Sequence, residues 1–183
     1  DDAELLDALE RRATEMGVPV ETAAADVREL ALGRRFGLIL APMQLIHLLG
    51  GVPGRARAWS ALTSHLAPSG LIAVAMLHEP LPPSGRAEPI PDVREVDGWV
   101  HSSLPLDVRV EEDSIELDRL RQVVSPEGRL SEDLDTTRLD RISIEMLRLE
   151  VAAAGLEVTS TEPIPATAEH VASLLVLIEA ADA

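Results

Sequence analysis

The side chains best suited to proton transfer are five histidines, because an unperturbed imidazole titrates near neutral pH. The candidates for a general base are His47, His78 and His101, although a histidine at such a position more often packs or lies at the surface. The histidines are scattered and cysteine is absent, so the sequence lacks the ligand spacing of a metal site. We therefore expect acid–base or binding chemistry without a metal.

Length, charge and residue composition exclude several classes of protein. The 183 residues can bury a sizeable core, and we expect residues 1–183 to form a single domain. The net charge is −16, and a negative field repels phosphate backbones, which disfavours nucleic-acid binding. No apolar run is long enough to span a membrane, and no signal-peptide pattern opens the chain. With no cysteine for a disulfide framework, the expected location is the cytoplasm.

Apolar runs indicate the strands of a parallel sheet. Residues 36–41 and 71–77 are near-continuous apolar runs, as expected of parallel strands covered on both faces. Residues 18–23 predict a further short strand, and Trp59 and Leu62 mark the buried face of a helix between the longer strands. This alternation predicts right-handed crossovers and a doubly wound sheet. Six side chains should be buried in the central sheet: Ile39, Leu40, Ile72, Val74, Leu175 and Val176.

A segment of different character interrupts this alternation. Residues 79–91 are rich in proline, which predicts a loop. Apolar and charged residues then alternate with a period of two at 106–111, which is typical of antiparallel strands. We therefore interpret residues 94–141 as a small antiparallel insertion. The earlier pattern resumes with a capped helix and two strands, at 143–155, 156–161 and 173–179.

The order of these elements resembles that of class I methyltransferases that use S-adenosylmethionine. The resemblance rests on Ala25-Asp26-Val27, on the turn Leu66-Ala67-Pro68-Ser69-Gly70 and on the run at 41–51, and it covers nearly the whole chain. It implies an α/β, Rossmann-like doubly wound sheet with a C-terminal antiparallel strand. It also implies S-adenosylmethionine as the cofactor and methyl transfer to a small-molecule acceptor.

One part of that fold is not found in residues 1–183. The family opens with a strand and a glycine-rich turn, whereas this chain opens on a predicted helix with an apolar stripe. The stripe consists of Leu6, Leu9, Ala13 and Met16. We therefore expect the first strand and glycine loop to be missing here. This chain should bind S-adenosylmethionine poorly unless a longer form supplies them.

The resemblance also implies contacts with the cofactor. Asp26 would accept a hydrogen bond from the adenine amino group, and Val27 would offer its backbone N–H to the ring. The alternative is that Asp26 caps a short helix at 28–32. Asp1 stands near the position of the acidic residue that binds the ribose hydroxyls. Ala41, Pro42 and Met43 would line the methionine end of the cofactor. The alternative is that these residues begin an ordinary helix, with proline near its first position.

The acceptor would lie beside that loop and under the insertion. The implied substrate contacts are Gln44, Trp99 and His101, and His47 is the best-placed candidate base for a hydroxyl acceptor. The insertion would cover the acceptor or pair two subunits into a homodimer, whereas Trp99 could instead seal the insertion's own core. Two other functions stay open: a noncatalytic interaction domain, and an oxidoreductase, which the lack of GxGxxG disfavours.

Overall fold

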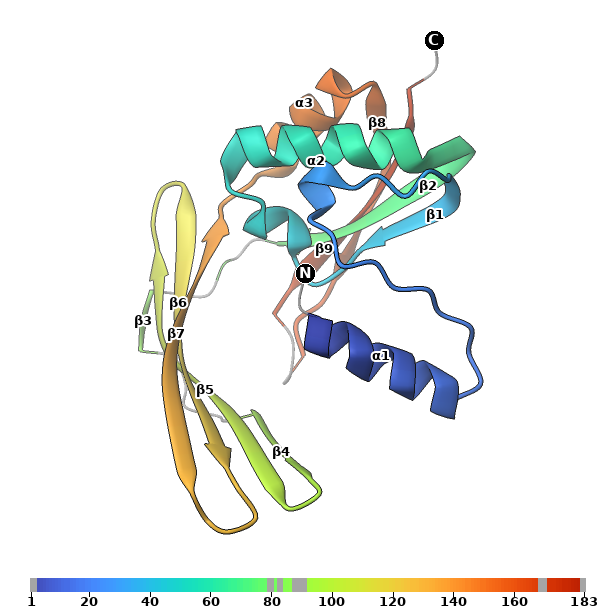
Figure 1. The fold of residues 1–183 in the computed structure, drawn as a ribbon. Coiled ribbons are helices and arrows are strands. Elements are labelled where there is room, and N and C mark those ends of the chain that lie inside the picture. The colour runs from blue at the N-terminus through green and yellow to red at the C-terminus, as the bar shows by residue number, and fades with distance from the viewer. Residues whose placement is uncertain (1–2, 79–80, 82–83, 87–91, 168–170, 182–183) are drawn as a thin grey trace.

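The computed structural model describes residues 3–78, 81, 84–86, 92–167 and 171–181. Its helices are α1 (Ala3–Glu15), α2 (Gly51–His65) and α3 (Ile144–Ala153), with short 3-10 helices η1 (Val27–Glu29) and η2 (Leu45–Leu48). Its strands are β1 (Phe36–Ala41), β2 (Leu66–Leu77), β3 (Gly85–Arg86), β4 (Asp92–Val96), β5 (Trp99–Val110), β6 (Ser114–Val124), β7 (Leu130–Asp140), β8 (Leu156–Ile164) and β9 (Ser173–Ala180). They form two separate sheets (Figure 1).

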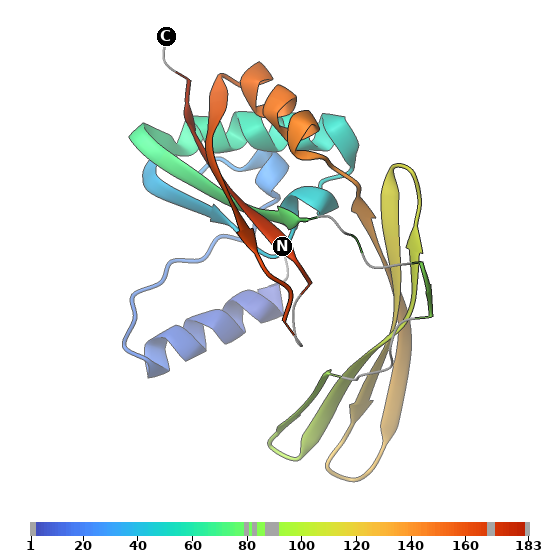
Figure 2. The ribbon, with the colours of Figure 1, turned by 180° about the vertical axis from the view of Figure 1, so that it is seen from behind.

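The first sheet has the strand order β1-β2-β9-β8. β1 and β2 are parallel, with Ile39 opposite Ile72, and β9 runs antiparallel to both β2 and β8. Helices α2 and α3 lie together on one face of this sheet, and α1 lies on the other side (Figures 1 and 2). The predicted α/β fold with a C-terminal antiparallel strand is confirmed.

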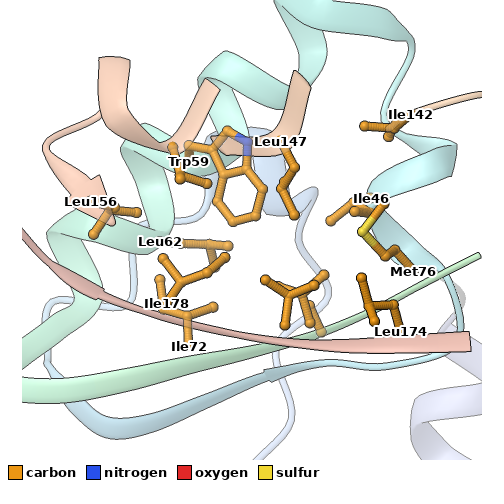
Figure 3. Close-up of a cluster of buried hydrophobic side chains, with 14 of the residues drawn as sticks. Ile46, Trp59, Leu62, Ile72, Met76, Ile142, Leu147, Leu156, Leu174 and Ile178 are labelled. Carbon is orange, nitrogen blue, oxygen red and sulfur yellow. The ribbon is translucent and has the colours of Figure 1, made fainter. Parts of the chain in front are cut away.

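The hydrophobic core lies between this sheet and helices α2 and α3 (Figure 3). The sheet contributes Ile72, Val74, Val176 and Ile178, none of which has any exposed surface. The prediction for Leu40 is wrong, because its side chain is 65% exposed on the opposite face of β1. A continuous apolar run does not reveal which of two alternating faces is covered, and here α2 and α3 cover one face only.

Glycine and serine set the ends of the two core helices. Ser143 accepts a hydrogen bond from the backbone N–H of Met146, which is the predicted N-cap of α3, and Gly155 follows that helix with a φ of +75°. Before α2, Gly50 and Gly51 both have positive φ, so the chain turns sharply between η2 and the helix. These residues therefore mark where α2 begins and where α3 begins and ends.

The strand predicted at 18–23 is wrong. The chain between α1 and η1 carries no regular structure and pairs with no described strand. A strand is held by hydrogen bonds to a neighbour, and Pro19 lacks the N–H that a ladder needs. Apolar composition alone therefore did not make this segment a strand.

The second sheet is the predicted insertion, although its first strand, β3, starts earlier, at Gly85. β5, β6 and β7 form a long antiparallel meander, flanked by β3 and β4 along β5. Residues 125–128 make the predicted turn, in which the N–H of Gly128 donates to the carbonyl of Ser125. The β4–β5 hairpin turns at Asp97 and Gly98, both with positive φ, as a two-residue hairpin turn requires.

Candidate functional site

The candidate site lies where β1 ends. Beyond Ala41, two successive residues, Met43 and Gln44, adopt left-handed backbone conformations with φ of 54° and 55°. Non-glycine residues rarely adopt this conformation, and backbone strain of this kind gathers at functional sites. Met43 is 82% exposed, and the side-chain amide of Gln44 donates to the hydroxyl of Ser173 at 3.5 Å. Of the predicted contacts, Ala41 is therefore the buried last residue of β1, whereas Pro42, Met43 and Gln44 form a strained loop rather than the start of an α-helix.

A hollow of about 400 Å³ lies beside this loop. It is lined from one side by Ala25, Asp26, Val27 and Arg28, and from the other by Leu45, Leu48 and Leu49. The structure therefore brings the predicted adenine contacts, Asp26 and Val27, together with η2. Asp1, predicted to bind the ribose, lies outside the described residues.

The Asp26 carboxylate has a defined role within the chain. It is the N-cap of η1, accepting from the backbone N–H of Arg28 at 2.8 Å, and it forms an ion pair with the Arg28 guanidinium. The side-chain and backbone hydrogen bonds from Arg28 lower the pKa of Asp26 to about 2. The capping role is thus observed, and the carboxyl is ionised at neutral pH. Its contact with adenine stays a prediction.

His47 is buried in η2, and both of its ring nitrogens are engaged. The backbone N–H of Leu77 donates to Nε2 at 3.0 Å, so Nε2 carries no proton. The proton is then on Nδ1, which lies 2.6 Å from the carbonyl oxygen of Asp140 and donates to it. Burial lowers the pKa of His47, which keeps the ring neutral. This geometry does not support the predicted role as a general base, since no lone pair faces solvent.

Neutral, buried His47 should make stability depend on pH. Below about 6.5 the unfolded chain takes up a proton at this imidazole more readily than the folded chain does. The free energy of unfolding should therefore fall as the pH drops from about 6.5 towards the lowered folded-state pKa. We expect His47→Gln to flatten this slope in urea titrations between pH 5 and 7, with exposed His101→Gln as the control. An unchanged slope in His47→Gln would contradict this assignment.

Three charged residues missed by the sequence analysis form a network that reaches His47 through Asp140. Arg55 on α2 is only 2% exposed, and its guanidinium forms ion pairs with Asp140 at 2.7 Å and Glu150 at 2.8 Å. Burial lowers the pKa of Arg55, but the hydrogen bonds and charges of the two carboxylates outweigh it and raise the pKa overall. One signal was present in the sequence, because Arg55 is on the same helix face as Trp59 and Leu62.

A second hollow, also of about 400 Å³, lies where the two sheets meet. His47, Met76, His78, Glu112, Ile142 and Glu145 are among its lining residues. His78, one of the candidate bases, follows the end of β2 and borders this hollow. The hollow is thus bounded by the core on one side and by the insertion on the other, as an acceptor site would be.

Trp99 and His101 lie far from these hollows. They belong to the β4–β5 hairpin, where Trp99 pairs with Val96 and His101 with Arg94. This hairpin is at the end of the second sheet that extends away from α2 and α3 (Figures 1 and 2). Trp99 is 45% exposed, so it does not seal a core within the insertion. In this conformation the structure does not bring either residue to Gln44.

Two further classes of site are not found among the described residues. No group of three or more histidine, aspartate or glutamate side chains in that part of the chain could hold a metal ion. None of the helices described there is long and apolar enough to cross a membrane. The candidate site consists of the two hollows and the strained loop after β1.

Comparisons with known proteins establish the fold. No protein-family model matches the sequence, and no curated protein matches it. Solved structures do match, among them an S-adenosylmethionine-dependent methyltransferase from Clostridium acetobutylicum, with a TM-score of 0.74 and 13% identity over 99% of this chain and 73% of that one. The CcbJ methyltransferase from Streptomyces caelestis matches with a TM-score of 0.67 and 21% identity, over 98% of this chain and 72% of that one.

A third match carries a more specific description. The sugar N-methyltransferase KedS8 from Streptoalloteichus is similar with a TM-score of 0.65 and 20% identity, over 91% of this chain and 66% of that one. The chain therefore has the fold of S-adenosylmethionine-dependent methyltransferases, as its sequence predicted.

Proposed function

We propose that this chain is the larger part of an enzyme that transfers a methyl group from S-adenosylmethionine to a small molecule. The observation that carries the proposal is the convergence of Asp26 and Val27 with η2 around one hollow, beside the strained loop that ends β1. In open α/β sheets, ligands bind at the carboxyl ends of the strands, which is where this hollow lies.

Each predicted contact has a chemical role in this proposal. The ionised Asp26 carboxylate would accept from an adenine amine, and the Val27 N–H would donate to the ring. Asp1 would bind the ribose, and Ala41, Pro42 and Met43 would line the methionine end. The cofactor supplies an already activated methyl group, so the protein mainly has to orient donor and acceptor and exclude water. Because such a step needs little side-chain chemistry, the structural role of His47 is compatible with it.

The second hollow is the proposed acceptor site. An amine on a small molecule suits it, because two carboxylates, Glu112 and Glu145, border it against one guanidinium, Arg141, and the chain carries a net charge of −16. The similar KedS8 is itself described as a sugar N-methyltransferase. Gln44, Trp99 and His101 would contact the acceptor only if the outer part of the insertion moved towards the loop after β1. His78, which borders the hollow, is the better-placed histidine.

A noncatalytic interaction domain is the second candidate function, and one surface favours it. On the sheet face opposite α2 and α3, Leu38 and Leu40 are 54% and 65% exposed. β1 is also an edge strand that pairs with β2 alone among the described strands. An apolar face next to an unpaired edge is typical of a surface that receives a partner. Pairing of two subunits through the insertion is a further proposal, because Leu130 and Leu134 are exposed on β7.

Binding of the demethylated cofactor, S-adenosylhomocysteine, tests the proposed function. Calorimetry would use residues 1–183 and, in parallel, the same chain with a strand and glycine-rich turn placed ahead of Asp1. We expect measurable binding by the extended form, and Asp26→Ala should weaken it by about 1–3 kcal/mol through loss of one charged hydrogen bond.

Asp133→Ala is the matched control for this titration, because it removes an exposed carboxylate on β7, far from the hollow. Circular dichroism would confirm that each variant is folded. Wild-type affinity in Asp26→Ala would remove that residue from the site. Failure of both forms to bind would exclude the methyltransferase function and leave the interaction domain.

A further inference from the structure

The insertion meets the core at a polar junction centred on Asp140. Asp140 is the last residue of β7, where the second sheet returns to the core. Its carboxylate oxygen Oδ2 accepts from the backbone N–H of Gly51 at 2.6 Å and from Nη1 of Arg55 at 2.7 Å. Its carbonyl oxygen accepts from Nδ1 of His47 at 2.6 Å. One residue therefore binds both η2 and the start of α2.

His47 extends the junction to the other crossing between core and insertion. Its Nε2 accepts from the N–H of Leu77, the last residue of β2, from which the chain leaves the core. One imidazole thus bridges the exit of the chain at Leu77 and its return at Asp140. Arg55 connects this junction to α3, because its guanidinium donates two hydrogen bonds of 2.8 Å to the carboxylate of Glu150. We call Leu77, His47, Asp140, Arg55 and Glu150 the neck.

The neck is the main attachment of the second sheet to the core. Among the described residues of β3 to β7, Ile115 is the one buried large hydrophobic side chain. Such a small apolar contact cannot by itself fix the direction of a long sheet, because hydrophobic contacts are not directional. Buried, charge-assisted hydrogen bonds are directional and specify one arrangement. The direction of the insertion should therefore depend on the neck.

We propose that Asp140 is a positioning residue, which holds the second sheet at one angle to the core and so sets the shape of the acceptor hollow. The part of this inference that concerns the acceptor rests on the proposed methyltransferase function, whereas the part that concerns the angle does not. Ile142 and His47 both line the hollow, and both lie next to Asp140 in sequence or in space. A substitution at Asp140 would therefore alter the hollow by displacing residues that line it, although Asp140 itself does not contact the acceptor.

The absence of cysteine from the sequence allows the angle to be measured with two introduced spin labels. Ser60→Cys on α2 and Ser131→Cys on β7 place labels at exposed positions on either side of the neck. Pulsed electron resonance would give the distribution of distances between them. The variants are Asp140→Ala and Asp140→Asn. The control is Asp135→Asn, also on β7, where the carboxylate forms a more exposed ion pair with Arg121.

We expect a narrow distribution in the wild type and in Asp135→Asn, and one at least twice as broad in Asp140→Ala. Asp140→Asn keeps a side-chain oxygen that can accept the hydrogen bond from the N–H of Gly51, but it loses the negative charge opposite Arg55. It should therefore broaden the distribution less than Asp140→Ala does. If Asp140→Ala does not fold, the width measured in Asp140→Asn decides the test. Distributions of wild-type width in both Asp140 variants, with folding confirmed, would overturn the proposal.

Enzyme kinetics separate this inference from the proposed function. In a methyl-transfer assay that uses the extended form and an amino sugar as the acceptor probe, Asp140→Asn should raise KM for the acceptor about tenfold and leave the affinity for S-adenosylhomocysteine unchanged. A loss of cofactor affinity equal to the rise in KM would overturn the acceptor role. If wild-type protein binds no cofactor but the label distances still respond to Asp140, the proposed function fails while the positioning role stands.

Discussion

Replacing Arg55 by alanine is expected to lower the free energy of unfolding by about 3–5 kcal/mol. The substitution leaves the carboxylates of Asp140 and Glu150 without their cation in a site where the side chains are only 21% and 10% exposed. Removing one partner of a buried ion pair costs more than the pair contributes, because the remaining charge is still poorly solvated. Urea denaturation followed by circular dichroism would measure the change.

Arg57→Ala is the matched control for this measurement. Arg57 is on the same helix, but its ion pair with Glu29 spans 3.6 Å between side chains that are more than half exposed. Such pairs contribute little, so we expect a change within about 0.5 kcal/mol. A loss below about 1 kcal/mol in Arg55→Ala would show that water reaches the carboxylates and that the junction is not a buried network.

Replacing Ile72 by alanine should cost about 2–5 kcal/mol of unfolding free energy. Ile72 has no exposed surface, and it lies in β2 between Ile39 of β1 and Ile178 of β9. The substitution removes apolar contacts and leaves a cavity that the helices above cannot readily fill. The same denaturation experiment would report the loss.

Leu40→Ala tests the assignment of the two faces of the sheet. Leu40 is on the neighbouring strand but 65% exposed, so its truncation should cost less than about 1 kcal/mol. Equal losses in the two variants would mean that something covers the opposite face in solution. A small loss in Ile72→Ala would instead show that β2 is not central to the core.

The elements of the fold could be predicted from the sequence where their periodicity was strong. The segment 143–155 had an N-cap serine, a stripe of apolar side chains and a glycine at its C-terminal end. In the insertion, apolar and charged residues alternated with a period of two. Residues 18–23 had apolar composition alone, and pairing partners decide whether such a segment becomes a strand. The exposure of Leu40 could not be predicted either, because it depends on which face of the sheet the helices cover.

The candidate site was predicted only in part. The family resemblance implied that Asp26 and Val27 contact the cofactor; the structure places both beside one hollow, and the contact itself stays a prediction. The neck could not be predicted, since Arg55, Asp140 and Glu150 are separated by long stretches of sequence and meet only in the folded chain. The neck also ties the predicted insertion to the core, because residues 94–141 include Asp140, whose removal would leave Arg55 without one of its partners.

The bridge that His47 makes between Leu77 and Asp140 has a consequence for how the chain could diversify. It brings the two ends of the inserted segment together, so the segment is a closed loop whose ends are fixed by the core. The entropy of closing a loop grows only slowly with its length, by roughly 0.6 kcal/mol for each doubling. Segments of different length and sequence could therefore be exchanged between these two points at little cost to folding. A core of this kind could carry different modules, while the residues of the core that hold the module stay the same.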